Sequence, residues 1–254
     1  MTITERHKFI IGQLNEKSNI DIGELSQSMK VSGVTIRKDL KILEEKGLLY
    51  RTKGGASVSN PYANERPINE KEFINVDQKK KIARTALKIV AETNSIIIGS
   101  GTTVFELSRC LFPARRLFVI TPALKVALEL YNRANIEVLQ LGGLIHSTSA
   151  SSAGAFAERV LEDISCDLLF LGVDGIDLEF GLTITNLVEA SLNQKMIQIA
   201  QKLVIMADST KFGKRGLGRI CGLEQVHSIV TDDRVPTAFI KQLEEKGIQV
   251  LIAG

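Results

Sequence analysis

Three segments within the first 45 residues repeat apolar side chains at helical spacing, and each repeat marks one buried face. The segments are residues 6–14, residues 22–29 and the stretch that begins at Ser32. Their apolar positions are Phe9, Ile10 and Leu14, then Leu25 and Met29, then Ile36, Leu40 and Leu43. Three helices joined by short connections predict a helix-turn-helix, whose second helix lies in the major groove of DNA.

The third helix has a polar, basic face opposite its apolar stripe. Asp21 and Ser32 precede the second and third helices and are the expected N-caps. The side chains that point away from the apolar stripe are the predicted DNA contacts of this helix, namely Ser32, Thr35, Arg37, Lys38 and Lys41.

Residues 48–58 are predicted to form a strand, a tight turn and a second strand. We expect Gly54 and Gly55 to supply the positive φ that such a turn needs, and Arg51 and Lys53 to reach the DNA backbone from it. Residues 1–58 are therefore predicted to form a winged helix-turn-helix domain.

Apolar periodicity disappears over residues 59–77, where Pro61 and Pro67 stand among polar residues. Prolines favour extended backbone before them, so this stretch is predicted to be a linker. Helical sequence resumes at Gln78, and residues 78–254 form the predicted second domain.

Short apolar runs alternate with helical patterns through the rest of the chain. They predict strands buried on both faces and hence a mostly parallel α/β sheet. The runs are 96–98, 117–120, 138–141, 168–171, 203–206, 229–230 and 250–252.

Ligands of such sheets bind at the carboxyl ends of the strands, so the loops after these runs hold the candidate ligand contacts. In the loop after the first run, backbone amides and hydroxyls at a helix start predict a phosphate site. The loop lacks Gly-Lys-Ser/Thr and the third glycine of Gly-x-Gly-x-x-Gly, so it is neither a P-loop nor a dinucleotide fingerprint. The candidates on this and the later loops are Ser100, Gly101, Thr102, Thr103, Gly143, Asp174, Asp208 and Lys211.

Two of these candidates have an alternative interpretation. Asp208 and Lys211 are three residues apart, so they also suit pairing with each other or capping of the next helix.

The formal net charge of +3 lies entirely in residues 1–55, which hold ten Lys or Arg against seven Asp or Glu. The remaining 199 residues hold 22 of each sign. A basic N-terminal domain is consistent with operator DNA as partner, although the surplus is small.

Other features narrow the class of protein. No run of eighteen apolar residues and no signal peptide are present, so we expect a cytoplasmic protein that does not bind membranes. The three cysteines and three histidines are scattered, which predicts reduced thiols, no metal site and no cofactor.

Residues 32–40, with Arg6 upstream and residues 51–56 downstream, resemble the signature of the DeoR family of bacterial transcriptional regulators. The resemblance implies a repressor that binds operator DNA as a homo-oligomer, a dimer or tetramer. Two recognition helices one DNA turn apart strengthen a weak single contact.

The resemblance continues through the second domain. It implies a sensor domain similar in fold to ribose-5-phosphate isomerase and the CoA transferases, which responds to phosphorylated sugars. The family's phosphate loop matches Gly101, Thr102 and Thr103, and its later segments match residues 172–175 and 208–213, with Thr183 and Glu189. Residues 173–183 are similar to the amino-sugar branch. The family usually has an aspartate where Gly99 stands.

The fold relation makes a sugar-phosphate isomerase the main alternative. Asp174, Asp208 or Glu189 with Lys211 would supply a base and a cation for that reaction. The Lys-Gly-Gly-Gly stretch of the isomerases is absent, however, so we predict a site that binds without turnover. A DNA-binding interaction module that ignores metabolites is the third possibility, which the retained phosphate loop disfavours.

Overall fold

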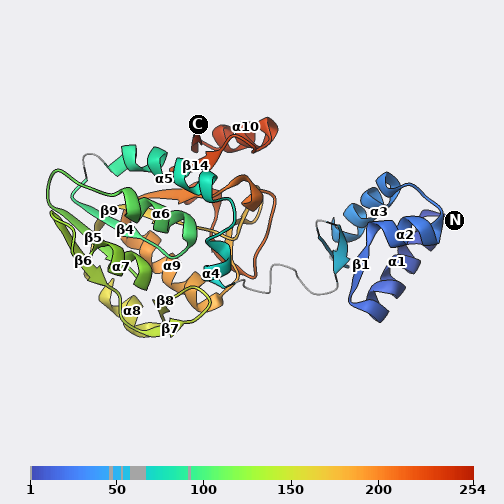
Figure 1. Cartoon of the computed structure of the whole chain (residues 1–254), viewed down its shortest axis with the longest axis horizontal. Coiled ribbons are helices and arrows are strands. Elements are labelled where there is room, and N and C mark those ends of the chain that lie inside the picture. Colours follow the sequence, from blue (N-terminus) through green and yellow to red (C-terminus); the bar gives the residue numbers. More distant parts are fainter. Residues whose placement is uncertain (1, 46–47, 53, 58–66, 91–92) are drawn as a thin grey trace. The chain divides into compact units, whose positions relative to one another are not determined.

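A computed structural model describes residues 2–45, 48–52, 54–57, 67–90 and 93–254. The chain forms two compact units, Met1–Asn64 and Glu65–Gly254. Each unit is described below by itself (Figure 1).

The N-terminal unit contains the three predicted helices and a small antiparallel sheet. The helices are α1 (Ile3–Lys17), α2 (Ile22–Met29) and α3 (Gly33–Glu45). The strands β1 (Asn19–Asp21), β3 (Gly55–Ser57) and β2 (Tyr50–Arg51) pair in that order. The hairpin of β2 and β3 is the expected wing, whereas β1 was not predicted from the sequence.

The apolar stripes of the three helices meet in one core, as the sequence predicts. Asp21 caps α2 by accepting hydrogen bonds from the amides of Gly23 and Glu24. The expected reason for the Gly54-Gly55 pair is wrong, because neither glycine has a positive φ. At Gly55 the need is steric, since a Cβ there would lie 1.7 Å from the carbonyl oxygen of Ile20 on β1.

The second unit is built on a seven-stranded parallel sheet in the order β15-β14-β12-β9-β4-β5-β6. Its strands correspond one to one to the seven apolar runs. They are β4 (Ser95–Ile98), β5 (Leu117–Thr121), β6 (Ile136–Gln140), β9 (Cys166–Leu171), β12 (Ala200–Met206), β14 (Ser228–Asp232) and β15 (Gln249–Ala253).

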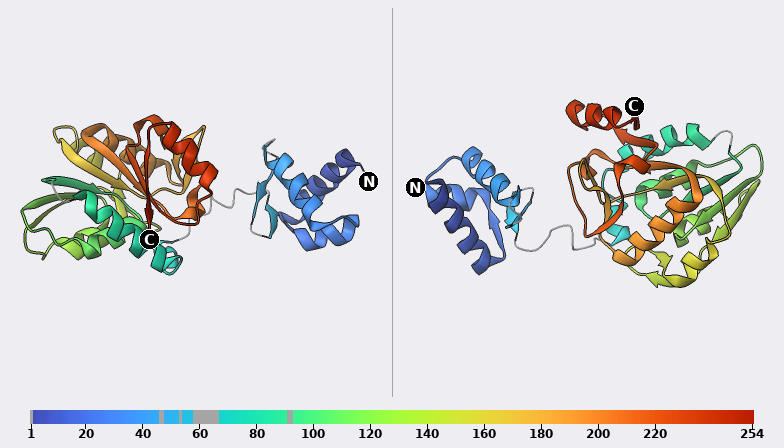
Figure 2. Two further views of the ribbon diagram at one scale, coloured as in Figure 1. Left: turned by 90° about the horizontal axis from the view of Figure 1, so that it is seen from above. Right: turned by 180° about the vertical axis from the view of Figure 1, so that it is seen from behind.

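Helices cover both faces of this sheet (Figure 2). Ile96 and Ile98 point into one apolar cluster with α5, α6 and α7, and Ile97 points into a second cluster with α8, α9 and α10. This arrangement explains why the strands read as continuous apolar runs. The helices are α4 (Ile68–Lys71), α5 (Val76–Val90), α6 (Thr102–Cys110), α7 (Leu124–Leu130), α8 (Ala155–Val160), α9 (Leu187–Ile199) and α10 (Thr237–Glu245).

Two smaller sheets were not predicted from the sequence. One pairs β7 (Leu144–His146) with β8 (Ser151–Ala153), and the other has the order β10 (Gly175–Asp177), β11 (Gly181–Ile184), β13 (Gly218–Cys221). Two short 3-10 helices, η1 (Ser209–Lys211) and η2 (Leu223–Gln225), complete the unit.

The boundary of the second unit lies earlier than predicted. The sequence places a linker at residues 59–77, yet α4 spans Ile68–Lys71 and the compact unit begins at Glu65. Ile68 is buried at 5% exposure, and its amide donates to the carbonyl oxygen of Thr148. One isolated apolar residue carries no periodicity, which is why the sequence did not reveal this helix. The predicted linker residues 59–66 lie outside the described residues.

In the described part of the chain, no helix combines the length and the apolar character needed to cross a bilayer. Cys110, Cys166 and Cys221 are all free. Burial raises the pKa of each thiol, and that of Cys221 reaches about 12.

Candidate functional site

The basic face that the sequence predicts on α3 is exposed. Arg37, Lys38 and Lys41 are exposed, whereas Ile36 and Leu40 on the opposite side are at most 1% exposed. The helix therefore presents one polar surface while the other side packs into the unit's core.

Ser32 caps α3, as expected. Its Oγ accepts a hydrogen bond from the amide of Thr35 at 3.2 Å and lies 3.0 Å from the Thr35 hydroxyl. Next to them, Val34 is 73% exposed. Val34 is not among the predicted DNA contacts, which are all polar side chains. An exposed apolar group at the start of a recognition helix is also able to contact a thymine methyl group.

The wing contributes one described cation. The Arg51 side chain lies 3.7 Å from the Glu44 carboxylate on α3, and the Arg51 amide donates to the same carboxylate at 2.9 Å. Lys53, the other predicted wing contact, lies outside the described residues.

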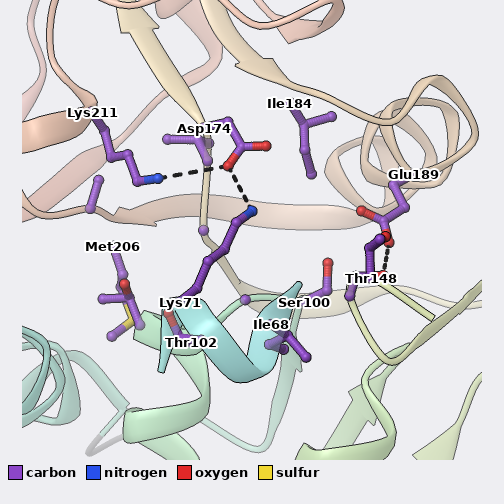
Figure 3. A pocket seen from close by; sticks show the side chains of 16 residues that line it. Ile68, Lys71, Ser100, Thr102, Thr148, Asp174, Ile184, Glu189, Met206 and Lys211 are labelled. Carbon is purple, nitrogen blue, oxygen red and sulfur yellow. Dashed lines mark hydrogen bonds and ion pairs between the residues drawn. The ribbon is translucent and has the colours of Figure 1, made fainter. Parts of the chain in front are cut away.

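A pocket lies at the carboxyl edge of the parallel sheet, where the loops after β4, β9 and β12 meet α4 and the start of α9 (Figure 3). Its open volume is about 60 Å³. The lining residues are Ile68, Lys71, Ser100, Gly101, Thr102, Thr103, Thr148, Ser149, Gly172, Val173, Asp174, Ile184, Glu189, Met206, Ala207 and Lys211.

The predicted phosphate loop forms one wall of the pocket. Gly101 precedes α6 with a φ of 123°, which suits glycine, and no side chain caps the first-turn amides. The N-terminus of α9 differs, because Asn186 accepts hydrogen bonds from the amides of Val188 and Glu189. The positive end of α6 is thus left for an anion, beside the hydroxyls of Thr102 and Thr103.

Asp174 stands between two lysines. Lys71 Nζ lies 3.3 Å and Lys211 Nζ 3.7 Å from its Oδ1, and both ammonium groups point toward it in Figure 3. Its Oδ2 accepts hydrogen bonds from the amide and the hydroxyl of Thr185. Burial opposes ionisation, but the two lysines and Thr185 outweigh it and lower the pKa of Asp174.

Glu189 forms the opposite side of the pocket. Its side chain accepts hydrogen bonds from the hydroxyls of Ser149 and Ser151, and the residue is only 3% exposed. Ser149 belongs to the connection between β7 and β8, so this hairpin positions the carboxylate from outside the main sheet.

The structure brings together seven of the ten predicted ligand residues and leaves three out of the pocket lining. Those three have structural roles. A Cβ at Gly143 would lie 2.6 Å from the Ala153 carbonyl oxygen, so this position fits glycine alone. Thr183 is fully buried and bonds the amide of Gly216. Asp208 caps η1 through the amide of Thr210, the alternative that the sequence left open.

Three residues of the pocket lining with charged or hydroxyl side chains were not among the predicted ligand contacts. Lys71 fell in the predicted linker, and Thr148 and Ser149 fell between apolar runs. The sequence does contain a cluster of hydroxyl residues at 147–152, which could have indicated that Thr148 and Ser149 contact a polar ligand. No comparable pattern marks Lys71.

Gly99 lies where the family usually has an aspartate. A Cβ at Gly99 would lie 2.6 Å from Leu171 Cδ2, so the Leu171 side chain occupies the space that a larger residue needs.

Over the described ranges, no cluster of three or more His, Cys, Asp or Glu residues is arranged to hold a metal ion.

Comparison with known proteins identifies both units. Residues 6–61 match the DeoR-like helix-turn-helix domain, and residues 74–233 match the DeoR C terminal sensor domain. The chain is 33% identical to the "Putative aga operon transcriptional repressor" of Escherichia coli O157:H7, over 99% of this chain and 94% of that protein. It is 37% identical to the uncharacterized HTH-type transcriptional regulator YulB of Bacillus subtilis, over 98% and 96%.

A solved structure of ribose 5 phosphate isomerase A from Neisseria gonorrhoeae covers 54% of this chain and 53% of its own length, with a TM-score of 0.40 and 18% identity. The family matches are to regulator domains across both units, so the isomerase alternative is set aside. The chain belongs to the DeoR family of DNA-binding transcriptional regulators.

Proposed function

We propose that this protein represses a sugar-catabolism operon and that a phosphorylated sugar, bound in the sensor pocket, controls its affinity for operator DNA. One observation carries the proposal: the uncapped N-terminus of α6 and the two lysines Lys71 and Lys211 line the same pocket.

This combination suits a phosphate group. First-turn amides and threonine hydroxyls donate hydrogen bonds to phosphate oxygens, and lysine ammonium groups neutralise their charge. Ser100, Thr102 and Thr103 are at most 9% exposed, so the donors are already held by the fold. A preformed donor set lowers the cost of binding.

The rest of the lining suits sugar hydroxyls. Asp174 and Glu189 are acceptors on two sides of the pocket, and the Ser149 hydroxyl lies beside Glu189. Carboxylates accept hydrogen bonds from hydroxyl groups. The aga operon in the name of the Escherichia coli relative and the family's repressors support a regulator of this kind.

On the DNA side, α3 supplies the contacts. Arg37, Lys38 and Lys41 lie on its exposed face, with Ser32 and Thr35 at its start, the end that reads base edges in a helix-turn-helix. Arg51 stays a predicted backbone contact from the wing.

Fluorescence anisotropy on DNA from the protein's own promoter region tests the proposal, with inorganic phosphate and a panel of hexose and hexosamine 6-phosphates. We expect salt-sensitive operator binding that one sugar phosphate weakens at least tenfold, equivalent to about 1.4 kcal/mol.

Two variants separate the DNA-binding face from the pocket. Arg37→Ala should lose operator affinity and keep effector affinity, whereas Lys211→Gln should lose effector affinity and keep operator affinity. Loss of both affinities in both variants would contradict the division between the two units.

We also propose a homo-oligomer. Six large apolar side chains are exposed on β7, α8 and α9 of the sensor unit, three elements that all contact β8, namely Leu144, Ile145, Phe156, Val160, Leu187 and Val188. Exposed apolar patches of this kind mark protein interfaces. Phe156→Glu should shift the mass measured by light scattering toward the monomer. Leu128→Glu on α7, also exposed, should leave the mass unchanged.

A further inference from the structure

One apolar side chain lies within the basic face of α3. Four residues at positions i, i+3, i+4 and i+7 share the exposed side of this helix, namely Val34, Arg37, Lys38 and Lys41. Val34 is the first of them along the helix and is 73% exposed. This side of α3, the DNA-contacting face, therefore carries three cations and one branched apolar group.

Other residues hold the start of α3 in place. Ser32 Oγ accepts a hydrogen bond from the Thr35 amide at 3.2 Å, and the Ser32 carbonyl oxygen accepts one from the Ile36 amide at 3.1 Å. Val31, before the cap, and Ile36 both pack in the apolar cluster of the unit, the arrangement of a hydrophobic staple. Val34 takes part in neither, and a β-branched residue forms helices less readily than alanine. Capping, packing and helix propensity therefore do not explain a valine at this position.

Val34 lies at the end of α3 that is suited to reading bases. The N-terminal residues of a recognition helix contact base edges in the major groove. The Arg37 guanidinium group lies beside the same turn, since a Cβ built on Gly33 would lie 3.7 Å from Arg37 Nη1. The first turn of α3 thus presents an apolar group and a cation next to each other.

The chemistry of valine selects one kind of base. Its side chain has no hydrogen-bond donor or acceptor, so it recognises a base edge only by apolar contact. In the major groove, thymine presents a C5-methyl group, whereas adenine, guanine and cytosine present hydrogen-bonding groups without a methyl group. A valine packed against a polar edge would leave donors or acceptors without partners. The base that suits Val34 is therefore thymine, or a cytosine that is methylated at C5.

We propose that Val34 is a specificity-determining residue that packs against the C5-methyl group of a thymine in the operator. This inference rests on the proposed DNA contacts of α3. The thymine lies close to the nucleotide that Arg37 contacts, because the two side chains lie on neighbouring turns of one face. Cations that contact phosphates add affinity for any sequence, whereas the methyl contact adds preference for one base.

The test removes methyl groups from each side of the contact. Footprinting of the full-length protein on DNA from its own promoter region locates the operator, and each thymine of the footprint is then replaced singly by deoxyuridine, which lacks only the C5-methyl group. Anisotropy gives the affinity of the wild type, of Val34→Ala and of the control Ile3→Ala. Ile3 is an apolar residue on α1 of the same unit and is 57% exposed.

We expect deoxyuridine at one thymine to weaken binding of the wild type and of Ile3→Ala by about three- to fivefold, the effect of losing one buried methyl group. Val34→Ala should bind the unmodified operator at least as weakly as the wild type binds this deoxyuridine operator, and deoxyuridine there should weaken it no further. At the same position, 5-methylcytosine should bind the wild type more tightly than cytosine by a similar factor, and Val34→Ala should bind the two equally.

Two results overturn the inference in different ways. If Val34→Ala abolishes the deoxyuridine effect at no thymine, while Arg37→Ala still loses operator affinity, α3 contacts the operator but Val34 does not read a methyl group. If neither Arg37→Ala nor Lys38→Ala weakens operator binding, the proposed DNA contacts of α3 fail and the inference fails with them.

Discussion

The guanidinium group of Arg6 holds the carboxylate of Asp39 through two hydrogen bonds, of 2.6 Å from Nε and 3.0 Å from Nη2. The pair joins α1 to α3, and Asp39 is only 2% exposed. Asp39 lies between Lys38 and Lys41 in sequence but on the inner side of α3. The contact therefore fixes the helix that presents the DNA-contacting face.

Arg6→Ala should weaken operator binding without removing a DNA contact. The variant leaves Asp39 as a buried charge without its guanidinium partner, which destabilises the packing of α3. We expect operator affinity measured by anisotropy to fall by roughly tenfold or more, and the N-terminal unit to unfold at lower urea concentration. Lys8→Ala removes an exposed cation from the same helix and should change neither quantity. Equal effects of the two variants would mean that α1 acts through its charge alone.

Lys38→Ala should change the salt dependence of operator binding. Each lysine that neutralises a phosphate releases counterions, so its loss lowers the slope of log affinity against log salt by about 0.9. Lys38 is exposed on α3 and suits such a contact. Anisotropy titrations at several salt concentrations give the slope, with Lys80→Ala as the control. An unchanged slope would remove Lys38 from the DNA-contacting face.

The sequence predicted those parts of the fold that apolar spacing encodes. Ile36 and Leu40 lie one helical turn apart, so they mark the buried side of α3, and the structure confirms it. The seven apolar runs became the seven strands of the parallel sheet because a strand covered on both faces needs apolar side chains at every position.

Polar strands and short helices could not be predicted in this way. The strand β8 consists of Ser151, Ser152 and Ala153, all buried, although two of the three are polar. Ser151 and Ser152 are buried because their hydroxyls bond Glu189 and the Leu141 carbonyl oxygen, respectively. These hydrogen-bond partners are distant in sequence, so no local sequence pattern predicts that the two serines are buried.

The pocket was predicted only in part for the same reason. The rule that ligands bind at strand ends located Asp174 and Lys211. It did not locate Lys71, whose contact with Asp174 joins positions 103 residues apart. It also placed Asp208 in the pocket, although the Asp208 carboxylate caps η1 instead.

Asp174→Asn should bind inorganic phosphate more tightly than the wild type, by about tenfold. The pKa of Asp174 is lowered by Lys71 and Lys211 despite burial, so at neutral pH the carboxylate is ionised and competes with any anion for both lysines. Inorganic phosphate is the probe, because Asp174 is also the expected acceptor for a sugar hydroxyl. Calorimetry gives the affinity, and Asp163→Asn at an exposed position is the control. Weaker phosphate binding would show that the two lysines need Asp174 to hold them in place.

Asp232→Asn should destabilise the sensor unit at neutral pH and weaken anion binding through Lys211. Asp232 is 1% exposed, and its Oδ2 accepts a hydrogen bond from the amide of Ser209 at 2.8 Å. Ser209 begins η1, the turn that carries Lys211, so the carboxylate positions that lysine. Loss of a charged, buried acceptor costs about 1–3 kcal/mol in the free energy of unfolding.

The stability that the Asp232 carboxylate adds should decrease as the pH is lowered. Burial opposes ionisation of Asp232, but hydrogen bonds from Arg234 and Ser209 outweigh it and lower its pKa below the ordinary value. A lowered pKa in the folded state adds stability that is complete above the unfolded pKa of about 3.9 and is lost as pH falls through the folded pKa. Urea unfolding of wild type and Asp232→Asn should therefore differ most at neutral pH, and the difference should shrink as pH falls from the unfolded pKa through the lower folded pKa. Asp233→Asn, the exposed neighbour, should match the wild type throughout. A difference that persists undiminished at low pH would mean that the amide disturbs packing and that the charge of Asp232 contributes nothing.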